Sequence, residues 1–560
     1  MNLLLILLSI YLICSFIGLY KIFAKAGENP IMAFVPGYNY FIWMKILEKP
    51  WWWMLIMIFP GLNFLMYAVY VYCTSIAMDK RSSADLAFAA FFPFLAILRL
   101  GFDPNITFIG TPKMDKKSTG TEWFEALIFA VIAASIIRGY FLEAFTIPTS
   151  SMEKDLLIGD YLFVSKLHYG VKVPETPVSL PFVHNNLPFS YIPSYFKSLK
   201  IPYTRLPKFT DVKRFDRVVF NFPTGDTAIL GNTAETSELQ GHNYYQMVRD
   251  QALYLFIIEN RIQQMTMADQ NKFMENRTKY EAKARKNLLE KNTYYTSSFK
   301  KIKTSGYVVR PTDKKENYIK RCVALPGDVL EFKNGTLWIN GEQNEVKETQ
   351  HFYYTTFNRV LRNNEIKALK TDFNISPVDI RSISNTAPLY SINMSAEKLT
   401  ELKNKFSASS DLQIINTEIK MSKKDSSYVD PRLSIYPNHP SFHWTQDNFG
   451  PLWMPKEGET ITLSDSTYYI YKRCIETYEH NSLEKRADGF YLNGEKADSY
   501  TFKQGYYYLV GDNRHNSADS RFWGFVPHDH VVGRAVFIWM SIDNDTGNIR
   551  WDRLFTIVHD

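Results

Sequence analysis

Two adjacent serines, Ser150 and Ser151, follow a long apolar segment in the stretch FTIPTSSMEKDLLIGDYLFVSK. A serine hydroxyl becomes an effective nucleophile only when a positioned base removes its proton. Lysine can be that base when burial disfavours its ammonium form, because the ordinary lysine pKa of about 10.4 keeps the side chain charged. The candidate bases are Lys154, Lys320 and Lys472.

Lys154 completes an S-x-x-K pattern with Ser151, which resembles the nucleophile motif of penicillin-binding proteins and β-lactamases. That motif lies at the start of a helix and is accompanied by a K-T-G element. This chain contains no K-T-G, and the residues after Lys154 have the pattern of a strand. The carboxylates of Glu153 and Asp155 would also keep Lys154 charged. We therefore do not expect Lys154 to be the base.

Lys320 lies in NYIKRCVALPGD, where period-two alternation places Tyr318, Lys320, Cys322 and Ala324 on one face of a strand. A lysine among aromatic and small apolar neighbours is a candidate for a lowered pKa. Alternation alone equally allows an exposed lysine. Lys472 in YIYKRC has nearly the same local sequence, so periodicity does not separate the two lysines.

The elements that must position these groups are mostly strands. From residue 147 to residue 560, short apolar alternations are separated by Gly, Asn and Asp, which is typical of antiparallel sheets. The predicted strands are 160–166, 217–222, 318–325, 328–332, 336–342, 506–512 and 534–542. We therefore expect a mainly β fold for this domain.

Two segments of the β-rich domain have a helical pattern instead. Residues 236–293 form a long helical insertion with Ser237 as a plausible N-cap, and residues 395–406 form a short helix capped by Ser395. The short helix lies within a further insertion at about 342–460.

The first 146 residues have the composition of a membrane region. We expect about three apolar segments in residues 1–122 and a final transmembrane helix in 123–146. The apolar runs are 3–20, 51–77, 86–98 and 124–142. The first run could also be a signal peptide, but it lacks a basic beginning. The third has 13 residues and could be a short span, a re-entrant segment or a buried hairpin arm.

The loop charges predict the orientation of these segments. Lysine and arginine residues are concentrated in 21–50 and 99–123, which the positive-inside rule places on the cytoplasmic side. The part of the chain after Leu142 is then outside, whether or not 86–98 crosses the bilayer. This orientation predicts a multi-pass protein whose β-rich domain works at the outer face of a membrane.

The bulk composition excludes several classes of function. The 64 basic and 57 acidic residues are mixed along the chain, and no basic block predicts nucleic-acid binding. The four cysteines match no zinc or CxxC spacing, and the histidines show no ligand spacing, so we expect no metal or cofactor. A disulfide between Cys322 and Cys474 stays open.

Four motifs follow the last apolar segment in a fixed order: IPTSSM, GDYLFVSK, NYIKRCVALPGD and GDNRHNSADSRFWGFVP. Together they resemble the ordered motifs of type I signal peptidase, the Ser/Lys protease that removes signal peptides. The last motif, at 511–527, is the most specific, because seventeen residues with this defined set of polar side chains do not recur by chance. The resemblance covers these blocks and the final apolar segment, and it does not cover residues 1–120 or the helical insertion.

The resemblance assigns the serine and the lysine. It implies that Ser151, directly before Met152, is the nucleophile and that Lys320 is the general base. The side chain of Thr149 and the backbone N–H of Ser151 would form the oxyanion hole.

The resemblance also implies supporting roles. Ser517 would hydrogen-bond to the lysine and orient it, and Asp519 and Arg521 would form a buried ion pair. Apolar side chains would line shallow pockets for small residues one and three positions before the cut. These side chains are Phe145, Ile147, Met152, Leu156, Tyr318 and Ile319.

The chain departs from the family pattern at a few positions beside the proposed site. Lys154-Asp155 stands where the family commonly has Pro-Thr, Ser150 stands where a small residue such as Gly is frequent, and His515 stands where Asp is frequent. None of these is a proposed catalytic position, so the departures concern pocket shape and loop rigidity.

The resemblance implies a function, partners and a location. The substrates would be the signal peptides of exported preproteins, cut without a cofactor at the extracytoplasmic side of a bacterial cytoplasmic (inner) membrane, with membrane lipid as a further partner. The extra spans and the helical insertion could bind a translocase, dock on lipid or only fill space. Two rivals are a penicillin-interactive acyl enzyme, which β-lactam labelling of Ser151 would reveal, and a non-catalytic membrane scaffold.

Overall fold

The computed structural model describes most of the 560 residues. The described residues are 3–59, 62–111, 119–180, 182–187, 192–223, 227–231, 244–263, 265–290, 293–295, 301–344, 349–373, 375, 379–383, 387–407, 412–419, 435–439, 441–544 and 546–558. They form two compact units, one of residues 1–143 with 171–207 and one of residues 144–170 with 208–560.

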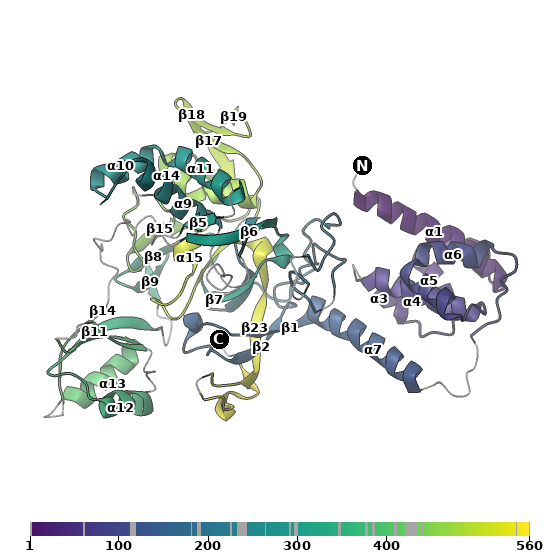
Figure 1. Ribbon diagram of the computed structural model, residues 1–560, viewed down its shortest axis with the longest axis horizontal. Helices are drawn as coiled ribbons and strands as arrows, with labels where there is room; N and C mark the ends of the chain where they lie inside the picture. The colour runs from purple at the N-terminus through teal and green to yellow at the C-terminus, as the bar shows by residue number, and fades with distance from the viewer. Residues whose placement is uncertain are drawn as a thin grey trace. The chain divides into compact units, whose positions relative to one another are not determined.

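The first unit is mainly helical (Figure 1). Its helices are α1 Leu3–Lys25, α2 Tyr38–Ile46, α3 Trp53–Ile56, α4 Leu62–Ala77, α5 Ser83–Phe91, α6 Pro93–Phe102 and α7 Thr119–Ile136. Glycines let α1 and α6 approach closely, because a Cβ on Gly101 would lie 3.0 Å from the carbonyl oxygen of Gly18. Buried Trp43 joins α2 to α4 by donating its Nε1–H to Thr74 Oγ1 at 2.9 Å.

Two of the four apolar runs of the first unit are each divided between two helices. The run 51–77 is divided between α3 and α4, and the run 86–98 is divided between α5 and α6. The second break occurs at Phe92, directly before Pro93, which has no N–H to continue a helix. Among the helices in the described ranges, none combines the length and the apolar character that a bilayer crossing needs. The transmembrane helices expected from the sequence are therefore not confirmed.

The second unit is built around an eight-stranded antiparallel sheet. The strand order is β1-β2-β23-β3-β7-β21-β22, and β24 pairs with β23. The strands are β1 Leu142–Thr146, β2 Asp160–Ser165, β3 Arg217–Asn221, β7 Asn317–Ala324, β21 Tyr506–Val510, β22 Val526–Pro527, β23 Val531–Ser541 and β24 Thr556–Ile557. Figure 1 shows the long strand β23 beside β2.

Alternation explains why these segments form strands with one buried face. In β2, Leu162 and Val164 are fully buried, whereas Tyr161 and Phe163, which alternate with them, are half-buried. A strand with period-two side chains can present such residues to a core on one face only. Each strand predicted from the sequence has an observed counterpart, except that the predicted strand 336–342 ends at Ile339 and a turn separates it from β10. Both belong to a second sheet, of order β10-β9-β8-β15. Its strands are β8 Val329–Lys333, β9 Thr336–Ile339, β10 Glu342–Asn344 and β15 Phe449–Trp453.

In the described part of the predicted helical insertion, residues 244–290 form three helices. They are α9 Tyr244–Glu259, α10 Met267–Glu275 and α11 Arg277–Glu290. Ser237, the expected N-cap, lies outside the described residues, and α10 begins at a capping box on Thr266. A small sheet, which the sequence analysis did not anticipate, accompanies these helices. Its order is β4-β6-β5, with β4 Thr227–Gly231, β5 Thr293–Tyr295 and β6 Lys301–Val309.

The further insertion contains an α/β module with its own core, here called the insertion module (residues 349–419). Its sheet has the order β12-β13-β11-β14 and two helices pack against it. The elements are β11 His351–Phe357, α12 Asn363–Phe373, β12 Ile380–Ser382, β13 Leu389–Met394, α13 Ala396–Ser407 and β14 Ile414–Ile419. The predicted cap of α13 is confirmed, because Ser395 Oγ accepts a hydrogen bond from the Lys398 amide.

The segment YIYKRC, which has the same local sequence as the lysine strand, is helical. It belongs to α14 Asp465–Arg473, where a capping box between Ser464 and Thr467 starts the helix. The expectation that Lys472 shares the context of Lys320 is therefore wrong. The disulfide left open is not formed either, since Cys322 and Cys474 are both buried free thiols.

Candidate active site

A serine and a lysine meet where β1 leads into a short turn beside β7. Ser151 lies in the 3-10 turn Ser150–Met152, and Lys320 lies in the middle of β7. Lys320 Nζ donates a hydrogen bond to Ser151 Oγ at 2.7 Å and another to the Ile319 carbonyl at 2.9 Å. Lys320 is 3% exposed and Ser151 is 9% exposed. The structure thus brings together the nucleophile and base predicted from the sequence.

Burial changes the acidity of the lysine in the direction that a general base needs. It lowers the pKa of Lys320 from 10.5 to about 8, although the negative charges of Asp519 and Asp512 oppose this shift. A pKa of about 8 leaves about a tenth of the side chain neutral at pH 7. The lysine can then accept a proton without a large penalty.

The other two lysines have different surroundings. Lys154 is near the acidic side chains of Glu153 and Asp379, and burial together with Asp379 raises the pKa of Glu153 to about 7. Lys472 Nζ contacts Tyr468 Oη at 2.8 Å and Glu476 Oε1 at 3.0 Å.

These contacts determine the charge state of Lys472. Although burial alone lowers its pKa, the hydrogen bond to Tyr468 and the charge of Glu476 raise it above the ordinary value. Lys472 is therefore held as an ammonium ion, which cannot act as a base.

Thr149 lies directly before the turn with an extended backbone. Its Oγ1 is 3.4 Å from Ser151 Oγ, so the hydroxyl is on the same side of the turn as the nucleophile. This position is compatible with the oxyanion role, which stays a prediction.

The loop after β21 holds the backbone of the serine turn. The Asn513 amide donates to the Ser151 carbonyl at 3.1 Å, and Asn513 Nδ2 donates to the Ser150 carbonyl at 3.1 Å. Asn516 Nδ2 donates to Ser150 Oγ at 2.9 Å. Gly511 makes this approach possible, because a Cβ there would lie 2.5 Å from the Ser151 carbonyl oxygen.

The sequence analysis quoted these residues inside a motif but gave them no role. The available signal was the density of amide side chains in GDNRHNS, which is typical of a loop that binds other backbone segments. Which segment the loop binds depends on tertiary structure. Ser150, a departure from the family pattern, is thereby explained as a partner of Asn516.

The predicted ion pair between Asp519 and Arg521 is present and completely buried. Arg521 donates to Asp519 through Nε at 2.9 Å and through Nη2 at 2.7 Å. Asp519 Oδ2 also accepts from the Gly511 amide at 3.2 Å. The pair therefore fixes the start of the loop that holds the serine turn.

Ser517 is buried beside Asp519. Although burial alone raises the pKa of Asp519, Arg521 and the Ser517 hydroxyl lower it. The expected hydrogen bond between Ser517 and Lys320 is not formed in this structure, since the lysine donates to Ser151 and Ile319 instead. An orienting role for Ser517 remains a prediction.

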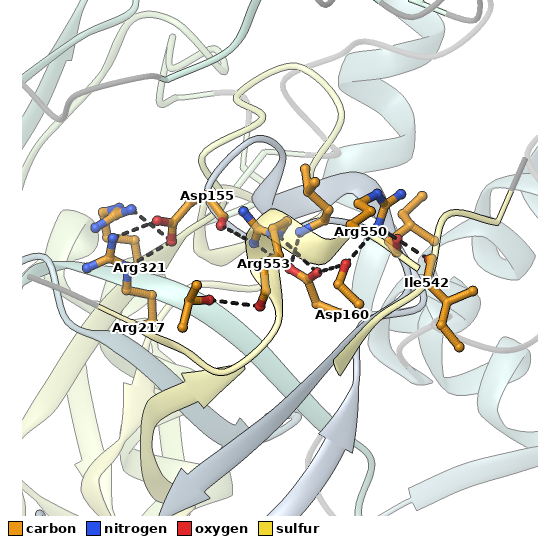
Figure 2. Close-up of polar contacts among 11 residues, drawn as sticks. Asp155, Asp160, Arg217, Arg321, Ile542, Arg550 and Arg553 are labelled. Carbon is orange, nitrogen blue, oxygen red and sulfur yellow. Dashed lines mark hydrogen bonds and ion pairs between the residues drawn. The ribbon is translucent and has the colours of Figure 1, made fainter. Parts of the chain in front are cut away.

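Asp155, the other departure beside the serine, is the centre of an ion-pair network (Figure 2). Arg217 donates to both Asp155 carboxylate oxygens at 2.7 and 2.6 Å, and Arg321 approaches the same carboxylate at 3.2 Å. Arg321 also forms a two-point pair with buried Asp512, at 2.7 and 2.6 Å. The network thus joins the serine turn, the lysine strand and the loop after β21.

The C-terminal segment extends this network to the start of β2. Arg553 Nη2 donates to the Asp155 carbonyl at 3.0 Å and to Asp160 Oδ2 at 2.6 Å (Figure 2). Arg550 donates to the Ile158 carbonyl at 2.9 Å. The segment between the serine and β2 is therefore held at both ends.

The apolar residues predicted to line the substrate pockets fall into three neighbouring clusters. Ile147, Met152 and Leu156 lie in one cluster that includes Ile319. Phe145 lies in a second cluster, which also contacts Ile319, and Tyr318 lies in a third, stacked on Phe222 at 4.4 Å. The first three side chains are only 0–4% exposed, and their role in lining substrate pockets stays a prediction.

The site contains groups suited to acyl transfer. Within the described ranges, no three His, Cys, Asp or Glu side chains gather in a way that could bind a metal ion. A buried serine with an amine 2.7 Å away and a flanking threonine hydroxyl can carry out nucleophilic attack on a carbonyl.

Comparison with known proteins agrees with this chemistry. The family described as signal peptidase, peptidase S26, matches residues 120–239, 247–387 and 455–540, which is more than half of the chain. The chain belongs to the signal peptidase S26 family. A second family, of unknown function (DUF5684), matches residues 31–111 in the first unit.

Curated signal peptidases are similar to the chain over shorter stretches. Signal peptidase I of Haemophilus influenzae is 33% identical over 122 residues, which are 21% of this chain and 33% of that protein. Signal peptidase I of Helicobacter pylori J99 is 34% identical over 133 residues, 21% of this chain and 39% of that protein. That of Aquifex aeolicus is 44% identical over 59 residues, 10% of this chain and 21% of that protein. The chain spans about a third of the length of the first of these relatives.

The S26 match includes the elements that form the candidate site. Ser151 falls in the first matched range, Lys320 in the second and the loop after β21 in the third. Residues 388–454, which include β13 of the insertion module, lie outside the match. This S26 member therefore combines the candidate site with a segment that lies outside the family match.

Proposed function

We propose that this protein is a serine endopeptidase that removes N-terminal signal peptides from exported preproteins. The observation that carries the proposal is the buried amine of Lys320, 2.7 Å from Ser151 Oγ and with its pKa lowered to about 8. An amine in this environment can be neutral at moderate pH, as a general base must be. Membership of the S26 family supports the substrate class.

The proposed reaction begins with proton transfer from Ser151 Oγ to Lys320 Nζ. The serine oxygen attacks the scissile carbonyl, and the Thr149 hydroxyl and the Ser151 amide donate hydrogen bonds to the developing oxyanion. The Lys320 ammonium then gives its proton to the leaving amine. The signal-peptide portion stays on Ser151 as an ester, which a water molecule deprotonated by the same lysine hydrolyses.

The substrate would bind in an extended conformation. β1 is the terminal strand of the described sheet order and leads directly into the serine turn, so its free edge can pair with a peptide backbone. Such pairing fixes which carbonyl reaches Ser151. Small side chains at alternate positions would then face the apolar residues Phe145 and Ile319.

The proposal includes a location at a bacterial cytoplasmic membrane, with the site on the extracytoplasmic side. The four apolar runs in the first 146 residues, three of which are uncharged, support multi-pass attachment. Exposed aromatic side chains near the C-terminus support lipid contact, because Trp551 is 73% exposed and Phe555 is 66% exposed. A translocase is a further proposed partner, for which the helical segment α9–α11 is the candidate surface.

The test is mass spectrometry of a signal-peptide-bearing precursor incubated with the full-length protein in detergent. We expect one cut after a small residue for the unaltered protein and no cut for Ser151→Ala or Lys320→Ala. Lys154→Ala and Lys472→Ala are matched lysine controls that should retain most of the activity. Loss of cleavage in Lys154→Ala together with an active Lys320→Ala would overturn the base assignment.

A further inference from the structure

The insertion module is hydrogen-bonded to the loop that holds the nucleophile. Its strand β11 begins beside that loop: the Gln350 amide donates to the Asp512 carbonyl at 2.8 Å, and the Arg514 amide donates to the Gln350 carbonyl at 2.8 Å. The Phe352 amide donates to His515 Nδ1 at 3.0 Å. These backbone contacts fix the module against residues 512–515.

His515 stands where the family often has Asp, and its contacts account for the difference. With Nδ1 accepting from Phe352, Nε2 carries the proton and donates to Asp447 Oδ1 at 2.7 Å. An ionised aspartate could accept from the backbone amide but has no proton to donate to a second carboxylate. The histidine is thus suited to a chain that carries this module.

One side chain of the insertion module contacts Asn513, the residue that donates hydrogen bonds to the Ser150 and Ser151 carbonyls. Asn393, in β13 and 2% exposed, donates from Nδ2 to Asn513 Oδ1 at 3.2 Å and to Asp379 Oδ1 at 3.2 Å. Its own Oδ1 has no hydrogen-bond partner among the described residues. The orientation of this amide is therefore set by its two N–H groups.

The contact determines which way the Asn513 amide faces. Asn513 Nδ2 donates to the Ser150 carbonyl, so its Oδ1 must point away from the serine turn, toward Asn393. If the amide turned over, two carbonyl oxygens would face each other at Ser150. A donor on the far side of Asn513 prevents this, because a buried carboxamide oxygen without a donor is costly.

The neighbours of Asn393 hold it rigidly. Ile392 and Met394, on either side of it in β13, are fully buried in the core of the module. A side chain anchored in this way can transmit the position of the module to the loop with little freedom of its own.

We propose that Asn393 of the insertion module is a positioning residue for the nucleophile: it orients the Asn513 amide, which in turn holds the Ser150–Ser151 backbone in reach of Lys320. This role rests on the proposed endopeptidase function. Through Asn393 the insertion module would contribute to the chemical step. Without the Asn393 amide, the serine turn would keep its fold, but Ser151 Oγ would lose its fixed alignment with Lys320.

The test uses full-length protein in detergent and a synthetic peptide that carries a signal-peptide cleavage site. In Asn393→Leu, which keeps the side-chain volume and removes the amide, kcat should fall by about 10-fold or more with KM unchanged, because misalignment of a nucleophile affects the chemical step. Ser391→Ala is the matched control: Ser391 lies two residues away in β13 and is 1% exposed, and its hydroxyl makes no hydrogen bond to a described residue. That variant should retain the wild-type kcat.

A double variant separates positioning from general destabilisation. If Asn393 acts through Asn513, then Asn393→Leu added to Asn513→Leu should lower kcat no further, since no amide remains to be oriented. Additive losses, or a kcat for Asn393→Leu equal to that of wild type, would overturn the proposal. If Asn393→Leu does not fold, Asn393→Asp replaces the donor at constant shape, and an undiminished kcat in that variant would overturn it equally.

The outcomes distinguish this proposal from the proposed function. Cleavage by wild type that is lost in Ser151→Ala, together with a fully active Asn393→Leu, overturns the positioning role alone. A wild-type protein that does not cleave overturns both.

Discussion

The pH dependence of cleavage follows directly from the burial of Lys320. Its pKa of about 8 predicts that kcat/KM, which reports the free protein, rises about tenfold per pH unit below pH 8 and levels off above it. Between pH 6 and pH 9 the neutral fraction of such a lysine increases about 90-fold. For a solvated lysine with the ordinary pKa, the same interval gives an increase of about 1000-fold and no plateau.

The measurement is kcat/KM for a synthetic signal-peptide substrate from pH 6 to pH 9.5 with the full-length protein in detergent. Lys472→Met is the control, because Lys472 is a half-buried lysine held as an ammonium ion and its removal should leave the profile unchanged. A profile that still rises tenfold per unit at pH 9 would refute the argument that burial makes Lys320 a base. A profile with its midpoint well below pH 7 would refute the assignment of lysine as the titrating group.

Three further predictions concern stability and the supporting contacts. The pKa of Lys320 is lower in the folded chain than the value of 10.5 that it has in the unfolded chain. Between about pH 8 and 10.5 the unfolded chain therefore binds more protons than the folded chain. The contribution of Lys320 to the free energy of unfolding then rises with pH across that window. Below pH 8 the burial of the Lys320 ammonium costs about 3 kcal/mol of folding stability. Lys320→Met should therefore be inactive but should have a higher thermal unfolding midpoint at pH 7. An unchanged or lower midpoint would contradict the desolvation argument. Gly511→Ala should lower both the unfolding midpoint and kcat, because its Cβ would clash with Ser517 Oγ and with the Ser151 carbonyl, and wild-type activity in this variant would contradict the close approach. Arg321→Met should destabilise the protein by about 3–5 kcal/mol in denaturant unfolding, because it leaves the Asp512 carboxylate buried without its partner, and adding Asp512→Asn should recover part of that loss.

The strand pattern of the second unit was predictable because the side chains of half-buried strands alternate between a buried and an exposed face. Leu162 and Val164 identify β2 without any tertiary information, and the same holds for β7 around Lys320. The choice between Lys320 and Lys472 was not predictable from alternation, since YIKRC and YIYKRC differ by one inserted residue. The capping box at Ser464 is the local signal that the second segment begins a helix.

The supporting residues of the site were only partly predictable. The ion pair between Asp519 and Arg521 is local in sequence and was expected from the motif that contains it. The contacts of Asn513 with Ser150 and with Asn393 join residues more than 100 positions apart, so no local pattern specifies them. The same is true of Asp155, whose departure from the family pattern acquires a physical reason only when Arg217 and Arg321 are placed beside it.

The most direct test of the central claim is to find the acyl group on the serine. The full-length protein is mixed with a precursor peptide, quenched in acid within one turnover, digested and mapped by mass spectrometry. The Ser151–Lys320 account predicts an ester between Ser151 Oγ and the carboxyl end of the signal-peptide portion, and no such adduct in Ser151→Ala. An adduct on Ser150 or another residue, or cleavage that persists in Ser151→Ala, would contradict it.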